Sequence, residues 1–269
     1  MYEAYWGLKE KPFENTPDPR FLYQFKDGDD VFTRLLYTLK GNRGAALLTG
    51  ESGCGKTLMA RALVRELDPV NTEIALLTNP SWSAEEFLRE VLYQLGEDSS
   101  LETRSQIVHR LHEILYSNYE AGKETLVLID EGQLIPDAAV FEEIRLVLNF
   151  QLNDAFLITL LLVGQPALAQ RVQDYEPLEQ RIATRGVLRP LPQEEVNNYI
   201  VHRLQIAGRE EAIFSPDAIE LVYRYSGGIP RKVNNICDIA LVIGYSSKLN
   251  CIDSDLIERL IQSESGNGT

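Results

Sequence analysis

The feature that most constrains this chain is a glycine-rich segment, Gly50–Thr57 (GESGCGKT), which matches the pattern G-x-x-x-x-G-K-[ST] at every fixed position. An apolar run, Ala45–Leu48, precedes it, and a helical pattern, Leu58–Leu67, follows. Strand, glycine-rich turn and helix in this order let backbone N–H groups surround a phosphate chain at a helix N-terminus, where negative charge is favoured. The segment therefore predicts a phosphate-binding loop in an α/β fold, rather than a chance strand–helix turn.

The residues of this loop have separate expected roles. Lys56 is expected to reach the β- and γ-phosphates, and the Thr57 hydroxyl to bind Mg²⁺. Cys54 is either a small filler inside the loop or a thiol that makes the site sensitive to oxidation. The predicted nucleotide contacts are Gly50, Glu51, Ser52, Gly53, Cys54, Gly55, Lys56, Thr57 and Leu58.

Further strands are indicated by short apolar runs that alternate with helical patterns. After Ala45–Leu48 come Ile74–Leu77, Leu126–Ile129 and Phe156–Val163, and Gly186–Leu191 is a candidate fifth strand. Continuous apolar strands separated by helices are typical of a parallel sheet that is covered on both faces. We therefore expect a five-stranded parallel sheet between layers of helices.

Polar side chains follow two of these strands directly. Asp130 and Glu131 end the run Leu126–Ile129, so Asp130 is expected to hold Mg²⁺ and Glu131 to deprotonate an attacking water, which favours hydrolysis as well as binding. Gln165 follows Val163-Gly164 and is placed to contact a γ-phosphate or its water, because ligands lie at the carboxyl ends of parallel strands. The alternative is a turn glutamine before Pro166. No Asn-Lys-x-Asp segment is present, so ATP is favoured over GTP.

Three arginines are further candidates. Arg181 and Arg185 are four residues apart, on one face if helical, and either could be a finger that a neighbouring subunit inserts beside a phosphate. The alternative is a surface helix arginine paired with an acid. Arg231 follows Gly227-Gly228-Ile229-Pro230 in the first turn of a predicted helix, where the helix dipole does not favour a cation. Arg231 is therefore expected to serve something other than its own helix.

After Pro192 the pattern changes to helices alone, which predicts a small second domain. Expected helices cover Glu194–Ala207, a segment capped by Ser215, Pro230–Ile243, and a segment capped by Asp253. The predicted parts are an N-terminal arm with a first helix (1–43, the helix over Asp29–Lys40), an α/β domain (44–191), a helical domain (192–262) and a disordered tail (263–269).

Charge and composition exclude several other classes. The formal net charge is −14 with no run of Lys or Arg, which argues against sequence-independent binding to nucleic acid or anionic lipid without excluding a local basic patch. The longest strongly apolar run, Ala155–Gly164, is half the roughly 20 residues that a spanning helix needs, so no direct membrane insertion is expected. The odd number of cysteines, without zinc spacing, fits the reducing cytoplasm.

Taken in order, these motifs resemble an AAA+ ATPase, and more closely the general secretion pathway protein A (ExeA-like) family, which is itself similar to ATPases of transposition. The segments that carry the resemblance, over about residues 1–262, are MYEAYWGLKEKPFENTPDPRFLY, LLTGESGCGKT, LVLIDEGQ, LLLVGQPAL, LEQRI and GGIPRKVNNICDIAL.

The resemblance implies a five-stranded sheet with a helical lid, ATP bound with Mg²⁺, and a homo-oligomer with nucleotide at its subunit interfaces. By motif position Gln165 is the first sensor, Arg231 the second, and Arg181 or Arg185 the finger. The implied function is a cytoplasmic ATPase, peripheral at the inner membrane through partners, that assembles or remodels a secretion, pilus or polysaccharide-export complex. The alternatives are a DNA-binding, transposition-type ATPase and a nucleotide-gated scaffold with little turnover. Whether the chain is a short family member or an isolated ATPase part stays open.

Overall fold

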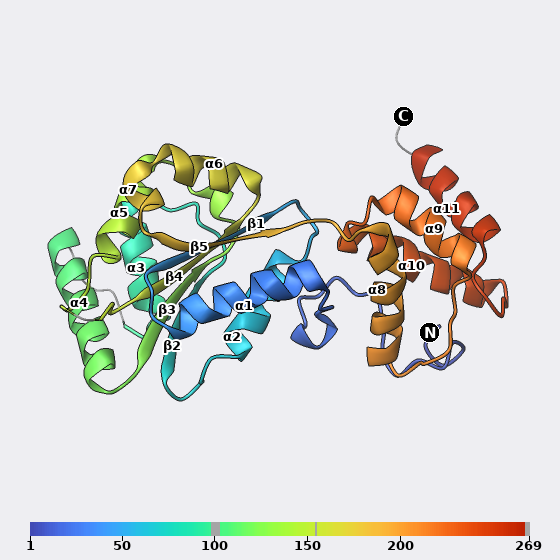
Figure 1. Cartoon of the computed structure of the whole chain (residues 1–269), viewed down its shortest axis with the longest axis horizontal. Coiled ribbons are helices and arrows are strands. Elements are labelled where there is room, and N and C mark those ends of the chain that lie inside the picture. The colour runs from blue at the N-terminus through green and yellow to red at the C-terminus, as the bar shows by residue number, and fades with distance from the viewer. Residues whose placement is uncertain (98–102, 154, 267–269) are drawn as a thin grey trace. The chain divides into compact units, whose positions relative to one another are not determined.

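The computed structural model describes residues 1–97, 103–153 and 155–266 of the 269-residue chain (Figure 1). They form two compact units. The first, here called the sheet unit, contains Lys26–Glu51 and Met59–Leu188. The second, the helical unit, combines Met1–Phe25, Ser52–Leu58 and the described part of Arg189–Thr269. The segment 1–43, expected as one part, therefore divides between the two units at Phe25.

The sheet unit contains a five-stranded, all-parallel sheet with the order β2-β3-β4-β1-β5, which confirms the predicted fold class. The first and last residues of the strands are Ala45–Gly50 (β1), Thr72–Leu77 (β2), Glu124–Ile129 (β3), Thr159–Gly164 (β4) and Ile182–Leu188 (β5). Because β4 lies between β3 and β1 and all three strands are parallel, the chain segments that follow them begin side by side at the carboxyl ends of the strands.

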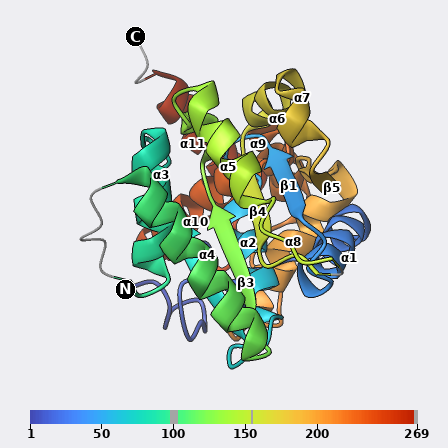
Figure 2. The same cartoon turned by 90° about the vertical axis from the view of Figure 1, so that its left-hand side faces the viewer.

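The central strands are mostly apolar, with threonine near one end of each, because helices cover both faces of the sheet. Every residue of β1 and β4 is buried. Figure 2 shows helices α3, α4 and α5 on one side of the strands and α1 and α2 on the other. These helices span Lys26–Lys40 (α1), Lys56–Arg65 (α2), Ala84–Gln94 (α3), Arg104–Glu120 (α4) and Ala138–Val147 (α5).

The outer strand β5 differs from its predicted range. It begins at Ile182 and ends at Leu188, whereas Gly186–Leu191 was expected. The first half of this edge strand alternates between exposed and half-buried residues, so it carries no continuous apolar run. Its partner β1 supplies the pairing, with Ala46 opposite Thr184 and Leu47 opposite Arg185. Strand β4 is also shorter than the predicted Phe156–Val163, since Phe156 instead forms an isolated antiparallel bridge to Gln151.

The helical unit contains four longer helices, as the pattern after Pro192 predicts. They are Gln193–Ile206 (α8), Pro216–Ser226 (α9), Pro230–Ser246 (α10) and Ser254–Gly266 (α11). The expected caps are present: the Ser215 hydroxyl accepts from Ala218 N–H at 3.2 Å, and Asp253 accepts from Leu256 N–H at 3.0 Å. Helix α11 continues to Gly266, so the tail expected from residue 263 is helical at first, and residues 267–269 lie outside the described residues.

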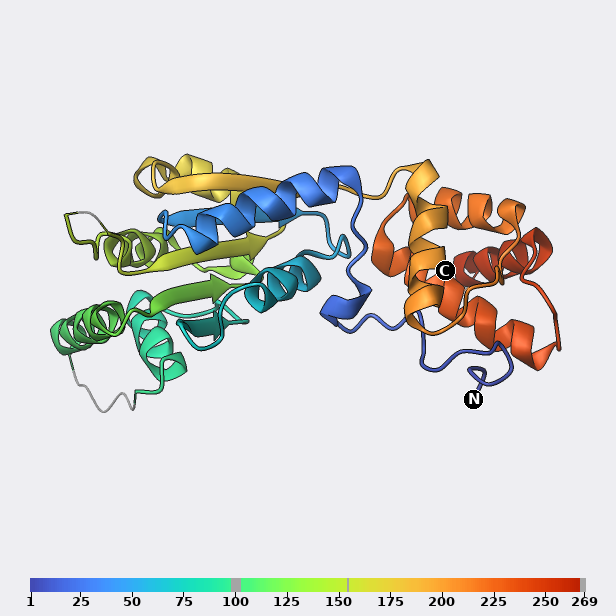
Figure 3. The same ribbon diagram turned by 60° about the horizontal axis from the view of Figure 1, so that its bottom comes forward.

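The first 25 residues pack along this helical unit (Figure 3). Trp6 is 2% exposed, and its indole N–H donates to the Leu241 carbonyl at 2.9 Å. Tyr2, Leu8 and Phe13 are buried in the same core as helices α8 to α11. Burial of each such side chain contributes about 1.5–3 kcal/mol relative to exposure, which explains why an aromatic segment adheres to the helices.

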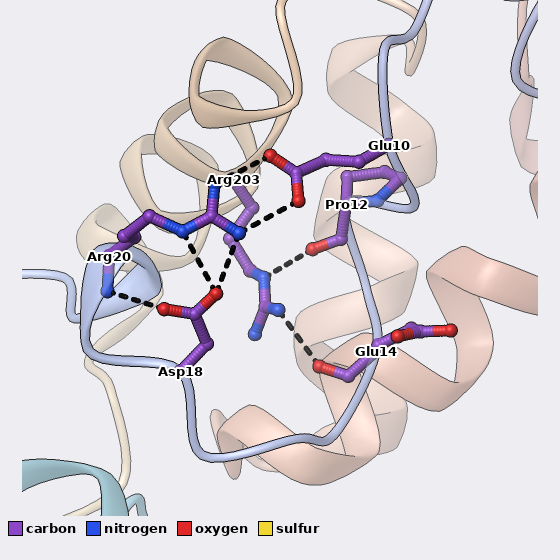
Figure 4. Close-up of polar contacts among 6 residues, drawn as sticks. All are labelled: Glu10, Pro12, Glu14, Asp18, Arg20 and Arg203. Carbon is purple, nitrogen blue, oxygen red and sulfur yellow. Dashed lines mark hydrogen bonds and ion pairs between the residues drawn. The ribbon is translucent and has the colours of Figure 1, made fainter. Parts of the chain in front are cut away.

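Two arginines fasten the same segment (Figure 4). Arg203 of α8 is 3% exposed and donates to the backbone carbonyls of Pro12 and Glu14, with its guanidinium 4.6 Å from the centre of the Phe21 ring. The Arg20 guanidinium makes two bonds of 2.9 Å to Glu10 and two, of 2.9 and 2.7 Å, to Asp18. Each guanidinium nitrogen of Arg203 donates to an oxygen, Nη1 to the Tyr199 hydroxyl and the other two to the two backbone carbonyls, which offsets the cost of burying the group. Among the described residues, no helix is both long and apolar enough to span a bilayer.

Candidate functional site

The loop after β1 has the backbone that a phosphate cradle requires. Gly53 and Gly55 have φ of +86° and +91°, which residues with a Cβ rarely adopt. Gly50 has a different need: a Cβ on it would lie 2.4 Å from the Leu188 carbonyl oxygen of β5. Helix α2 begins at Lys56, so the N-terminal end of a helix, where negative charge is favoured, lies at the end of the loop. The glycines, the helix start and the buried Lys56 together fit a bound phosphate chain.

The end of β3 carries two carboxylates in different conformations. Asp130 is 7% exposed, and its Oδ1 accepts from Glu131 N–H at 2.8 Å. Glu131 itself has φ +52°, in the left-handed region, which costs about 1–2 kcal/mol for a residue with a Cβ. Such strain is concentrated at functional sites. A carboxylate such as that of Asp130 and a hydroxyl such as that of Thr57 are the kinds of oxygen ligand that Mg²⁺ prefers.

The segment after β4 is joined to Glu131 by Gln133, the last residue of the segment LVLIDEGQ, to which the sequence analysis assigns no role. Its Nε2 donates to Glu131 Oε2 at 2.5 Å, and its Oε1 accepts from Gln165 N–H at 2.9 Å. The register of the parallel strands explains why these residues lie close together, since Ile129 of β3 pairs with Leu162 of β4, and Gly164 of β4 pairs with Thr49 of β1. The local sequence shows an amide two residues after the acid pair, and this spacing alone does not indicate a contact with Glu131. The contact depends on the turn Gly132–Leu134 (η2).

Arg181 and Arg185 do not share a helix face, contrary to the conditional expectation for them. Helix α7 (Glu176–Glu179) ends before Arg181, and Arg185 lies within β5. The chain becomes extended there because it pairs with β1: Ala45 N–H donates to the Arg181 carbonyl at 3.3 Å. The Arg181 side chain donates to Asn149 Oδ1 at 2.5 Å, and Arg185 forms an ion pair with Glu179.

The position of Arg181 has a consequence for any finger role. Ala45 is the first residue of β1 and Gly50 the last. At about 3.3 Å per residue, these ends are about 17 Å apart. Arg181 therefore lies near the amino ends of the strands, whereas the phosphate loop begins at the carboxyl end of β1.

Arg231 lies against the phosphate loop within the helical unit. It is the second residue of α10, and its backbone N–H donates to the Gly53 carbonyl at 3.2 Å. A Cβ on Gly53 would approach the Arg231 Cβ to 2.9 Å, so this contact also requires glycine at position 53. The structure thus brings Arg231 to the loop, and it brings Glu131 to Gln165 through Gln133.

Comparison with known proteins gives the same fold and a family. A family model described as an AAA domain matches residues 39–172. General secretion pathway protein A of Aeromonas hydrophila is 38% identical over 251 residues, which are 91% of this chain and 45% of that protein. The chain thus spans about half the length of this relative.

Two solved structures share the fold. The Aeropyrum pernix ORC2 protein, in its ADPNP–ADP complexes, has a TM-score of 0.66 at 17% identity, with 90% of this chain and 71% of that chain covered. The Aeropyrum pernix ORC1 protein in complex with DNA has a TM-score of 0.69 at 14% identity, covering 95% and 70%. These identities establish the fold alone. The AAA-domain match and the 38% identity to general secretion pathway protein A show that the chain belongs to the AAA+ family related to that protein.

Proposed function

We propose that this chain binds ATP with Mg²⁺, hydrolyses it, and uses the cycle to assemble or remodel a secretion, pilus or cell-envelope polysaccharide export complex. The observation that carries the proposal is that three predicted site segments begin at the carboxyl ends of adjacent parallel strands. The phosphate loop follows β1, the pair Asp130-Glu131 follows β3, and Gln165 follows β4 between them. The nature of the complex is proposed from the relative's name, general secretion pathway protein A.

The residues divide the work as follows. Lys56 and the loop amides bind the phosphates, and Thr57 with Asp130 would hold Mg²⁺, which would supply positive charge at the phosphate oxygens. Glu131 accepts a proton from the attacking water. Gln165 and Arg231 are the proposed side-chain contacts to the terminal phosphate. The strained backbone of Glu131 and the contact of Arg231 with Gly53 support these assignments.

The assembly proposed is a homo-oligomer in which Arg181 or Arg185 contacts the nucleotide of a neighbouring subunit. The support is the position of Arg181 at the amino end of β1, whereas its own phosphate loop follows the carboxyl end of that strand. We propose a cytoplasmic location, with attachment to the inner membrane through partner proteins.

Lys56→Ala is expected to remove ATP binding, because Lys56 is the buried cation of the loop and nothing else in Gly50–Thr57 is positively charged. Isothermal titration calorimetry with ATP and Mg²⁺ measures it. Lys123→Ala, which removes an exposed ion pair with Glu73, is the control and should bind ATP like the parent. Equal binding by the Lys56 variant and the parent would contradict the phosphate-loop assignment, and absence of turnover in the parent would contradict the ATPase itself.

The second candidate is action on DNA, which the fold similarity to the ORC1 protein in complex with DNA favours. The net charge of −14 opposes it, because DNA affinity depends on phosphate neutralisation by Lys and Arg. We expect dissociation constants no tighter than about 1 μM for random duplex at physiological salt, the range of non-specific binding. Gel shifts with and without ATP measure this affinity. Sub-micromolar binding would favour the DNA-acting alternative over the secretion-type function.

A further inference from the structure

We propose that Gln133 is a positioning residue for hydrolysis: it orients the carboxylate of Glu131 and ties that carboxylate to the segment after β4. The proposal rests on the proposed ATPase function and adds a residue to it. Gln133 does not lie in the glycine loop, and it follows the acid pair on the turn η2. Its side chain nevertheless bridges the two strand ends that carry the base and the first sensor position.

The two contacts determine how the Gln133 amide is oriented. Oε1 faces the N–H of Gln165 at 2.9 Å, and Nε2 faces Glu131 Oε2 at 2.5 Å. Reversal of the amide would set an N–H₂ group against a backbone N–H and a carbonyl oxygen against a carboxylate, so both bonds would be lost. The amide therefore has one orientation: Gln133 accepts from the N–H of Gln165, the residue after β4, and donates to the Glu131 carboxylate.

The backbone of Gln133 is held from a third element. Arg171 of helix α6 (Pro166–Asp174) donates through Nη1 to the Gln133 carbonyl at 3.1 Å and also to the Ile135 carbonyl. The Arg171 guanidinium lies 5.0 Å from the centre of the Phe141 ring. Leu134 N–H closes the turn onto the Glu131 carbonyl at 2.9 Å. Side chain and backbone of Gln133 are thus both restrained, as a residue that orients another must be.

The absence of a side chain at Gly164 leaves room for the Gln133 side-chain amide. A Cβ on Gly164 would lie 2.8 Å from Gln133 Oε1 and 2.7 Å from Leu168 Cδ2. Glycine at position 164 therefore leaves room for the amide beside the last residue of β4, and a side chain there would displace it. This explains why Gly164, whose φ is not in the left-handed region, is still glycine.

The bond from Gln133 engages one oxygen of Glu131, Oε2, and fixes the plane of the carboxylate. We assign the proton of the attacking water to the other oxygen, Oε1. The bond also helps to hold Glu131 at φ +52°, a conformation that persists only when its surroundings impose it. Because Gln165 N–H is at the far end of the same amide, movement of the β4–α6 turn is transmitted to Glu131.

The test compares Gln133→Leu, which removes both bonds, with Gln133→Glu, which keeps an acceptor for Gln165 N–H but replaces the donor to Glu131 by a carboxylate. Misplacement of a catalytic group by about 1 Å can cost on the order of 10²-fold in rate. Both variants are expected to lower kcat for ATP by about 10- to 100-fold, with KM and the calorimetric ATP affinity within about threefold of the parent.

The control is Gln94→Leu, since Gln94 also donates its amide to a carboxylate, Glu90 Oε1 at 2.9 Å, but on helix α3. It should retain the parent's kcat. If Gln133→Glu retained the parent's kcat, the donor bond would be irrelevant and the proposal overturned. If either Gln133 variant weakened ATP binding as much as turnover, a structural role would replace it. Should the Leu variant fail to fold, the nearly isosteric Glu variant decides.

A double-mutant cycle with Glu131→Gln separates action through Glu131 from any other action. If Gln133 works through Glu131, adding Gln133→Leu to Glu131→Gln should lower kcat by less than about twofold further, because residues that act as a unit are not additive. A full second loss of 10-fold or more would overturn the proposal. A parent chain without turnover would overturn the ATPase function itself, whereas an active parent with fully active Gln133 variants would overturn only this inference.

Discussion

Mixing a Lys56→Ala chain with an Arg181→Ala chain is expected to restore ATP hydrolysis that neither variant supports alone. The Lys56 variant keeps its arginines, and the Arg181 variant keeps its phosphate loop. Arg181 lies beside Ala45, at the start of the strand whose far end leads into the loop, so we predict that it serves the site of a neighbouring subunit and not its own. A finger contributes about 10³-fold or more to turnover, whereas loss of a surface ion pair costs about 0–1 kcal/mol.

The same mixture with Arg185→Ala identifies which arginine acts. Arg185 forms an ion pair with Glu179 in which the side chains are 38% and 33% exposed, so its replacement alone should change stability little. Parent activity is expected to rise faster than linearly with protein concentration, and ATP to promote oligomers, measured by steady-state assay and light scattering. If both arginine variants hydrolyse ATP like the parent at every concentration, the finger assignment is wrong and the segment only pairs with β1.

Glu131→Gln is expected to lower turnover by about 10²-fold or more while ATP binding is retained. The change removes the base and preserves size, and the amide oxygen can still accept the bond from Gln133 Nε2, so the turn η2 should survive. Single-turnover hydrolysis measures the chemical step, and calorimetry measures binding.

A matched control is Glu90→Gln, because Glu90 accepts a side-chain amide bond from Gln94 on helix α3, away from the strand ends. It should hydrolyse ATP like the parent. Hydrolysis by the Glu131 variant at the parent rate would mean that another group takes the proton, and the roles of both Glu131 and Gln133 would then be withdrawn.

Prediction of the strands from sequence depended on where each strand lies in the sheet. β1, β3 and β4 are central, and their runs of buried residues were found from the apolar pattern with only the boundaries shifted. β5 is an edge strand, and in its half Ile182–Arg185 half-buried residues alternate with the exposed Ala183 and Arg185, so it carries no apolar run that would indicate a strand. An edge strand is half-solvated, so local composition does not distinguish it from an amphipathic helix.

The first 25 residues show a similar limit. Their aromatic residues and prolines predict an anchored segment, but the anchor cannot be identified from the segment itself. Trp6 finds its acceptor at Leu241, and Arg203 finds Pro12 and Glu14, across more than 180 residues of chain. Contacts of this separation depend on the packing of α8 and α10, which no local pattern encodes.

The sequence by itself determined what is local: the phosphate loop, the acid pair at a strand end, the glutamine after β4 and the helical character after Pro192. Each follows from a spacing of a few residues, because loop glycines, caps and apolar periods act over one or two turns of chain. Only the tertiary structure decided which groups meet. The strand order places Gln165 beside the end of β3. The turn after Glu131 places the Gln133 amide between Glu131 and Gln165. Pairing with β1 places Arg181 at the amino ends of the strands, away from the end at which the loop begins. The physical reason is that parallel strands adjacent in the sheet are far apart in sequence, so their register is set by burial of both faces and not by any neighbouring residues.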